Sequence, residues 1–106
     1  MAEDATHRRT QLVIDGMLRP VGYEQITSLA AAQSLTLPAV GNARAVYALI
    51  ECESQAVRWR DDGTNPTAAV GMPLPVDTPF WYNGDLATFK VIEQTPSAKV
   101  NVCYYA

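Results

Sequence analysis

The chain has 106 residues, of which 48% are hydrophobic and only 18% are charged, and its formal net charge at neutral pH is -3. This length fits one compact domain, and the apolar content is sufficient for a core, which excludes disorder. The eight basic residues are spread along the chain and form no basic stripe, so nucleic acid is not expected as a partner.

The N-terminal residues are expected to form an extended arm. Residues 1–9 are polar, include Arg8 and Arg9, and have nothing to bury in a core. The apolar run that follows, Leu12-Val13-Ile14, is too short for a signal peptide or a membrane span. The sequence therefore predicts an arm over residues 1–15, a single domain over residues 16–106, and no contact with a membrane.

The first half of this domain is interpreted as strands. Residues 22–37 allow a helical turn around residues 29–33, but the Thr, Ser and Pro residues on either side favour short strands. Residues 45–53 form the longest apolar run, and they alternate. One face has Val46, Ala48, Ile50 and Cys52, and the other has Tyr47, Leu49, Glu51 and Glu53. With a tight turn at Ser54-Gln55, this strand would form a hairpin with the next one and place Ile50 opposite Trp59.

Residues 57–67 are the most informative part of the chain, because an alternating strand runs into a dense cluster of turn residues. Val57 and Trp59 are expected to face the core, with Arg58 and Arg60 on the outside. Asp62-Gly63 tolerates positive φ, and the proline at position 66 has no amide to pair, so the strand must end here. We predict an exposed hairpin loop after residue 60.

The second half continues the pattern of short strands. A strand is expected at residues 67–70, then a proline-punctuated stretch, an aromatic triplet at 80–82 before an Asn-Gly turn, and final strands at 86–93 and 98–105. No segment has the pattern of a sustained amphipathic helix. The chain is therefore predicted to be all-β, an antiparallel sandwich or barrel.

Few residues are suited to catalysis or metal binding. The single histidine, His7, lies in the polar arm, and no nucleophile, zinc or phosphate-loop motif is present. Cys52 and Cys103 lie in strand-like segments without CxxC spacing, and we expect two buried free thiols, with a disulfide as the alternative. We predict no enzyme, no cofactor and no metal.

The carboxylates leave two alternatives open. The loop at residues 61–65 is rich in oxygen ligands, but it fails the EF-hand template and is expected to be an ordered turn rather than a calcium site. A small sandwich enzyme would need two carboxylates to converge in a pocket with raised pKa values. The candidates for such a pair are Glu51, Glu53, Asp61 and Asp62.

The aromatic pair Trp81 and Tyr82 has three interpretations. The rings could form a sugar-binding platform oriented by Asn83 and Asp85, or Trp81 could plug one end of the sandwich, or the pair could contact another subunit. The plug is the preferred interpretation of Trp81. Arg58 and Arg60 are either solvated outer-face charges or contact residues.

Several segments carry a family resemblance. They are Pro38 with residues 43–50, residues 56–63 with Pro66-Thr67 and Gly71-Met72, Gly84-Asp85-Leu86, and residues 100–105. In these segments the chain resembles small structural virion proteins of tailed bacteriophages, over roughly residues 34–106, and the block from Arg58 to Gly63 is the most specific part. The triplet at 80–82 departs from the pattern. The resemblance implies a jelly-roll-like β-sandwich that decorates or completes a capsid or lies at the head-tail junction.

We therefore expect a capsid decoration or cement subunit, assembled in the host cytoplasm and located in the virion. It would form a homo-oligomer and bridge neighbouring major capsid proteins by surface burial and by exchange of strands or arms. The expected contact residues are Arg8, Arg9, Arg58, Arg60, Asp62, Trp81 and Tyr82. The alternatives are a head-tail connector or tail accessory protein, and a carbohydrate-binding module that uses Trp81 and Tyr82.

Overall fold

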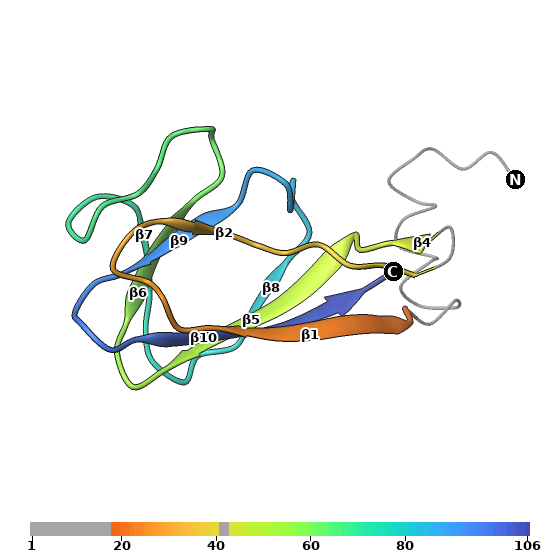
Figure 1. Cartoon of the computed structure of the whole chain (residues 1–106), viewed down its shortest axis with the longest axis horizontal. Helices are drawn as coiled ribbons and strands as arrows, with labels where there is room; N and C mark the ends of the chain where they lie inside the picture. Colours follow the sequence, from red (N-terminus) through yellow and green to blue (C-terminus); the bar gives the residue numbers. More distant parts are fainter. Residues whose placement is uncertain (1–17, 41–42) are drawn as a thin grey trace, which may run out of the picture.

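The computed structural model describes residues 18–40 and 43–106 (Figure 1). Within these ranges the chain forms ten strands and no helix, and hence no helix that could cross a membrane. The strands are β1 (Pro20–Ile26), β2 (Gln33–Ser34), β3 (Ala39–Val40), β4 (Ala43–Arg44), β5 (Tyr47–Glu53), β6 (Val57–Arg60), β7 (Met72–Leu74), β8 (Phe80–Tyr82), β9 (Lys90–Glu93) and β10 (Lys99–Tyr105). The predicted arm over residues 1–15 lies outside the described residues.

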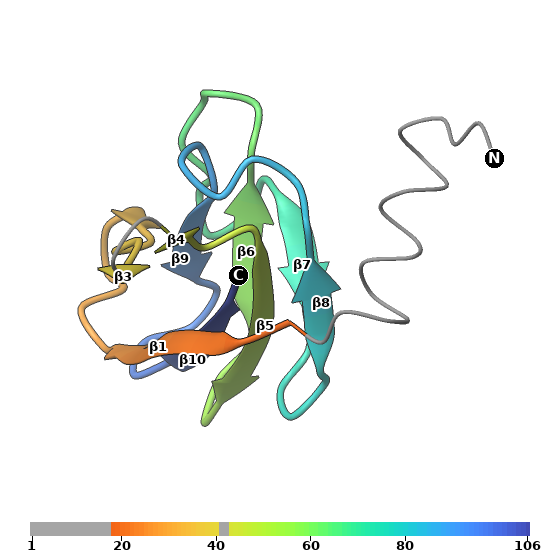
Figure 2. The same cartoon turned by 90° about the vertical axis from the view of Figure 1, so that its right-hand side faces the viewer.

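Eight of the strands form two four-stranded antiparallel sheets. Sheet A has the order β1-β10-β5-β8, sheet B has the order β2-β9-β6-β7, and β3 pairs with β4 in a separate ribbon. Figures 1 and 2 show β1 and β10 in one layer and β6 and β9 in the other. The predicted all-β, antiparallel architecture is confirmed.

The core lies between the two sheets and follows from strand alternation. In β5 the side chains of Ala48, Ile50 and Cys52 are buried, and their neighbours point to the other face, as the sequence predicts. The prediction is wrong for Val46, because β5 starts only at Tyr47 and Val46 is 50% exposed. β10 adds a second alternating series to the core from sheet A. The buried side chains on β10 and on sheet B are Val57, Leu74, Val91, Val100, Val102 and Tyr104. Both sheets therefore bury one face against the other.

The predicted hairpin between β5 and β6 is wrong. β5 pairs with β10 and β8 in sheet A, whereas β6 pairs with β9 and β7 in sheet B. Ser54 adopts φ 76°, and the Gln55 amide donates to the Glu53 carbonyl at 2.9 Å, so the chain turns sharply and crosses to the other sheet. Ile50 and Trp59 thus belong to facing sheets rather than to paired strands.

Two further boundaries differ from those predicted. Thr67 and Val70 exchange backbone hydrogen bonds of 2.8 and 3.2 Å, so residues 67–70 form a turn, and the strand starts only at Met72. Residues 86–89 are also not strand, because Leu86 and Phe89 fill the core from a loop before β9 begins. β7 is an edge strand, which is where its proline is tolerated.

The edge of sheet A at β1 is held by a buried tyrosine. The Tyr104 hydroxyl donates to the Glu24 carboxylate, which also accepts the Thr36 amide at 2.7 Å. Burial and the nearby carboxylate raise the pKa of Tyr104 above its usual range. A side chain on Gly22 would meet Pro38, since a Cβ there would lie 2.9 Å from the Pro38 Cγ. Residues 35–38 therefore cross close over β1.

Both cysteines are free thiols. Cys52 is buried on the inner face of sheet A, where its thiol donates to the Leu74 and Pro75 carbonyls, and burial raises its pKa. Cys103 is only half-buried and lies on the outer face of the same sheet, so the expectation that both thiols are buried is wrong for Cys103. Because the two side chains point to opposite faces, they cannot form a disulfide with each other.

The raised tyrosine pKa values predict a loss of stability at alkaline pH. The folded chain keeps the hydroxyl protons of Tyr82 and Tyr104 at pH values where the unfolded chain loses them. Their stabilising contribution is therefore fully present below the ordinary tyrosine pKa of 10.0 and is lost progressively above it. We expect the free energy of unfolding, measured by urea titration, to fall above that pH.

Tyr104→Phe is the control for this effect. At pH 7 it should lower the free energy of unfolding by about 1.5 kcal/mol, because a hydrogen bond to a carboxylate is lost. Above pH 10 its stability should decline less steeply than that of the wild type, since one ionisable hydroxyl is gone. A decline as steep as that of the wild type would contradict the role given to Tyr104.

Candidate interaction surfaces

The long loop between β6 and β7, residues 61–71, is held in place by Arg58. The Arg58 Nε donates to the Ala68 carbonyl at 3.1 Å, and its Nη1 donates to the Gly71 carbonyl at 2.8 Å. Arg58 points away from the core, as predicted, but its guanidinium serves the loop of its own chain. β6 and β7 pair antiparallel on either side of this loop, so the hairpin predicted after residue 60 is confirmed, and its loop is ordered by these bonds.

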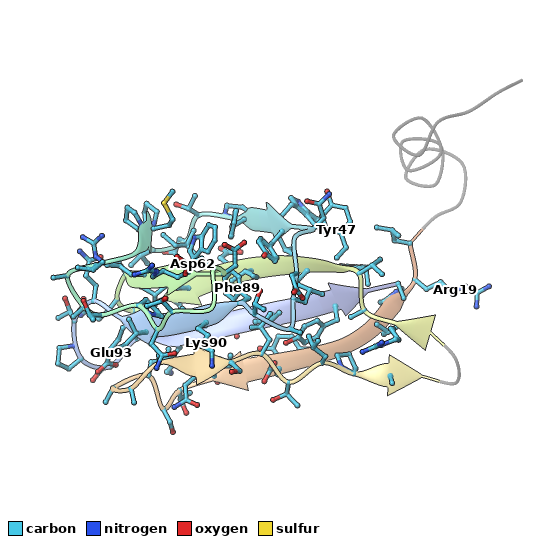
Figure 3. The ribbon with its side chains drawn as sticks, turned by 90° about the horizontal axis from the view of Figure 1, so that it is seen from above. Arg19, Tyr47, Asp62, Phe89, Lys90 and Glu93 are labelled. Atoms are coloured by element: carbon cyan, nitrogen blue, oxygen red, sulfur yellow. The ribbon has the colours of Figure 1, made fainter. Side chains whose placement is uncertain are left out.

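Arg60 and Asp62 form a two-pronged ion pair at the surface of this loop. The Arg60 Nε lies 3.0 Å from Asp62 Oδ1, and its Nη2 lies 2.5 Å from Oδ2. The guanidinium holds the pKa of Asp62 at about 2, helped by the Thr64 amide, which donates to Oδ1 at 3.3 Å. Figure 3 shows Asp62 among the side chains on this side of the sandwich. Asp62 is exposed and Arg60 is partly exposed.

Asp61 connects this loop to the one that follows β8. The Tyr82 hydroxyl donates to Asp61 Oδ2 at 2.6 Å, and the Thr88 hydroxyl lies 3.0 Å from the Asp61 carbonyl. Gly84 packs on the Tyr82 ring so closely that any side chain at position 84 would overlap the hydroxyl. The two loops meet at one end of the molecule, in green and blue in Figure 2. The Arg58–Gly63 block and the Gly84-Asp85-Leu86 segment of the resemblance are therefore neighbours in the structure.

Tyr82 is buried, at 6% exposure, so its ring offers no surface to a partner or a sugar. The expectation that Tyr82 is a contact residue is wrong for this reason. Burial and the Asp61 carboxylate raise the pKa of Tyr82 above its usual range, as expected for a hydroxyl enclosed in the fold.

Trp81 lies on the outer face of sheet A and is 51% exposed, so it does not plug the sandwich. In the register of the sheet, Trp81 is the partner of Leu49 on β5. Leu49 is in turn the partner of Cys103 on β10, and Cys103 is the partner of Tyr23 on β1. These four side chains form a continuous line across all four strands, which we call the apolar row. Tyr23 is 62% exposed.

Two more aromatic rings lie beside the apolar row. The ring of Tyr47 packs edge-on against Trp81, with ring centroids 5.5 Å apart, and the ring centroid of Tyr105 lies 5.6 Å from that of Trp81. Tyr47 and Tyr105 are themselves register partners, so they form a second row next to the first. The sequence places Tyr47 and Leu49 on one strand face, but the alignment of this face with Cys103 and Tyr23 depends on strand register.

The other end of the same face is polar. Gln25, Asn101 and Glu53 are joined by hydrogen bonds of 3.0 to 3.2 Å, and the Tyr23 hydroxyl donates to Asn101 at 2.6 Å. Glu51 stands opposite Asn101, and Glu53 stands opposite Lys99. The outer face of sheet A is therefore divided along its strands into an apolar end and a charged end.

A second group of exposed apolar side chains follows the β7 edge. Val70 is 54% exposed and Met72 is 56% exposed, and the prolines at positions 73 and 75 are also exposed. Because proline has no amide to donate, this edge is a poor site for adding a strand.

The candidate carboxylates do not come together. Glu51 and Glu53 point outward from sheet A, whereas Asp61 and Asp62 belong to the loop that leaves sheet B. Both aspartates are engaged in hydrogen bonds within the chain, which agrees with an ordered turn. In the described part of the chain no three His, Cys, Asp or Glu side chains are arranged to hold a metal ion. Arg8 and Arg9 lie outside the described residues.

Comparisons with protein-family models, with curated proteins and with solved structures found no match for this chain.

The two glycines of the loop differ in a way that can be tested. Gly63 has φ 88° with open space around it, whereas Gly71 has φ 145° and a Cβ there would lie 3.1 Å from the Arg58 and Pro66 Cβ atoms. Gly63→Ala should cost about 1 kcal/mol of backbone strain. Gly71→Ala should cost about 3 kcal/mol, because crowding is added to strain.

Urea unfolding of both variants measures this difference. Gly63→Ala is the matched control, because it makes the same chemical change at positive φ without a neighbour. Equal losses for the two variants would mean that the loop does not pack on Arg58 as described.

Proposed function

We propose that the protein is a structural virion subunit of a tailed bacteriophage, a capsid decoration or cement protein. The observation that supports this most directly is the outer face of sheet A, where Trp81 and Tyr23 are exposed and the other members of the apolar row and its flanking rings are partly exposed. Contiguous exposed apolar surface marks interaction sites on soluble proteins. A subunit that works by contact needs such a surface rather than a pocket.

We further propose that the fold is a jelly roll. When the eight strands of the two sheets are counted in chain order, sheet A has the order 1-8-3-6 and sheet B has the order 2-7-4-5. This is the order produced when a long hairpin folds over into two Greek keys, and it is a common architecture of viral capsid domains. Lectins and cupins share the architecture, so it supports the proposed role without selecting it.

The proposed mechanism is burial of surface between repeated copies. The outer face of sheet A supplies apolar contact area, with Trp81 as its most prominent ring, and Arg60 with Asp62 supplies charge at one end of the molecule. The arm over residues 1–15, with Arg8 and Arg9, would reach a neighbouring subunit. Many weak contacts of this kind add up when the partner surface is a repeating shell.

Two alternatives remain as proposals of lower rank. A head-tail connector or tail accessory protein would use the same surfaces with a different copy number. A carbohydrate-binding module would have to rely on Trp81 without Tyr82, since the second ring of the expected platform is enclosed in the core. A glycan array with Trp81→Ala addresses that alternative, because binding that does not depend on Trp81 ends it.

The main test is to quantify this protein in purified particles of the phage that encodes it. A decoration protein that covers a repeating shell should be present in hundreds of copies, whereas a single closed ring at the head-tail junction would contain only about a dozen. Absence from the particles would overturn the proposal.

Binding to particles that lack the protein tests the surface itself. Trp81→Ala should weaken binding about tenfold, as expected when a large ring at the centre of a contact is removed. Met72→Ala is the matched control, because Met72 is equally exposed but lies on the β7 edge, and it should bind like the wild type. Unchanged binding of Trp81→Ala would exclude the outer face of sheet A as the site.

A further inference from the structure

We propose that the segment Leu12-Val13-Ile14 of one copy of this chain pairs as an added strand with β8 of a second copy, at the free edge of sheet A. This inference rests on the proposed function, because it assigns the proposed exchange of arms to one donor segment and one acceptor edge. The outer face of sheet A stays available for the shell, since an added strand lies beside β8 and does not cover the face.

The two sheets have four edges, and β8 is the edge that suits an added strand best. Sheet A ends at β1 and β8, and sheet B ends at β2 and β7. β7 contains a proline, and β2 has only two residues, both of them polar. β1 is crossed by residues 35–38, which are tied to it by the bond from the Thr36 amide to the Glu24 carboxylate.

The backbone of β8 is free on the side that faces away from β5. In an edge strand, every second residue directs its amide and carbonyl away from the sheet. Residues 80–82 contain no proline and pair with β5. Among the residues that the structure describes, they form no other backbone hydrogen bond. This edge can therefore accept the backbone of another chain.

β8 is aromatic on both faces, so an added strand must be apolar on both faces as well. Tyr82 and Phe80 point inward, and Trp81 points outward. Phe80 remains partly exposed although its ring stacks on that of Trp59 in β6, with centroids 5.2 Å apart. The core is thus incompletely covered along this edge. Side chains on the same face of neighbouring strands pack beside each other, so apolar residues at three successive positions would gain most here.

Leu12-Val13-Ile14 is the one run of three apolar residues in the sequence of residues 1–17. When the middle residue of the run lies opposite Trp81, the first and third residues lie on the inner face, beside the two inward rings of β8. A shift by one residue would place Gln11 and Asp15 on the inner face instead. Burial of these polar groups is unfavourable, so the pattern of the run sets the register.

The length of the connection selects a second copy as the acceptor. Arg19 is fixed beside Ala106 by two backbone hydrogen bonds of 2.8 and 2.9 Å, just before β1. A strand added to β8 lies four strand spacings from β1, about 19 Å in total. The five residues from Ile14 to Arg19 span at most about 18 Å when fully extended, and they would also have to turn out of the strand direction. The run is therefore too close to β1 to pair with β8 of its own copy.

We expect the added strand to be antiparallel to β8. Parallel pairing is slightly less stable per residue, and it would continue along Pro79, which has no amide to donate. With Val13 opposite Trp81, the antiparallel direction brings Arg9 toward Asp85, which is exposed. Opposite charges at the end of the pairing favour this direction over its reverse.

The first experiment is sedimentation velocity of the full chain from low to several hundred micromolar. The wild type should shift from monomer to oligomer. Val13→Pro should weaken this association at least tenfold, because a proline in the middle of the run blocks strand pairing. Ala5→Pro is the matched control, since it makes a comparable change outside the run, and it should associate like the wild type. Thermal unfolding should show that each variant is folded.

The second experiment traps the register with a disulfide. Residues directly opposite each other on antiparallel strands have Cα atoms about 4.5 to 5.5 Å apart, within the range of a disulfide. The double variant Val13→Cys with Trp81→Cys should therefore form covalent oligomers on a non-reducing gel. Ala5→Cys with Trp81→Cys is the control, because it has the same number of thiols, and it should form at least tenfold less covalent oligomer.

Three outcomes would overturn the proposal. They are a wild type that is monomeric at every concentration, an association that survives Val13→Pro, and a disulfide that closes within one copy in the double variant. None of them bears on whether the protein is present in particles, which is measured by its copy number there. Absence from particles would likewise leave the strand exchange between purified copies unaffected.

Discussion

The structure depends on two strands that are apolar along the whole of their inner face and at one end of their outer face. β5 and β10 lie side by side in the middle of sheet A, and their inward side chains form half of the core. Their outward side chains near one end, Leu49, Tyr47, Cys103 and Tyr105, are apolar as well. A strand on the surface of an antiparallel sheet normally alternates between apolar and polar side chains. The inner face of these two strands packs in the core of the chain. The apolar end of their outer face is the part that we propose to contact another protein.

At the far end of the sandwich, several polar side chains form hydrogen bonds that hold the loops in place. Arg58 holds the loop at residues 61–71, and Asp61 receives the Tyr82 hydroxyl. These groups form hydrogen bonds with other groups of the same chain. Their effect is to make the end of the molecule rigid, so that Arg60 and Asp62 are presented in fixed positions. Rigidity of this kind lowers the entropic cost of binding to another protein.

The sequence predicts well which side chains of a strand share a face, but it predicts poorly which strands pair with each other. The faces of β5 and the outward direction of Arg58 and Arg60 follow from the period of two. The same period cannot tell whether two apolar-faced strands pair side by side or face each other across a core, so β5 and β6 were placed in a hairpin. In the aromatic triplet of β8, the register with β5 decides which ring is buried, since Tyr82 stands opposite inward-facing Ala48 and Trp81 opposite outward-facing Leu49. The apolar row is invisible in the sequence because its members come from four separate strands.

The central claim is that the outer face of sheet A is a contact surface, and hydroxyl-radical footprinting of the purified chain tests it most directly. Trp81 and Tyr23 react readily when exposed, and Met72 on the β7 edge reports a surface that the account leaves open. The account predicts that oxidation of Trp81 and Tyr23 falls when the chain is bound to particles that lack it, while oxidation of Met72 stays constant. Equal oxidation of all three side chains in the free and the bound chain would contradict it.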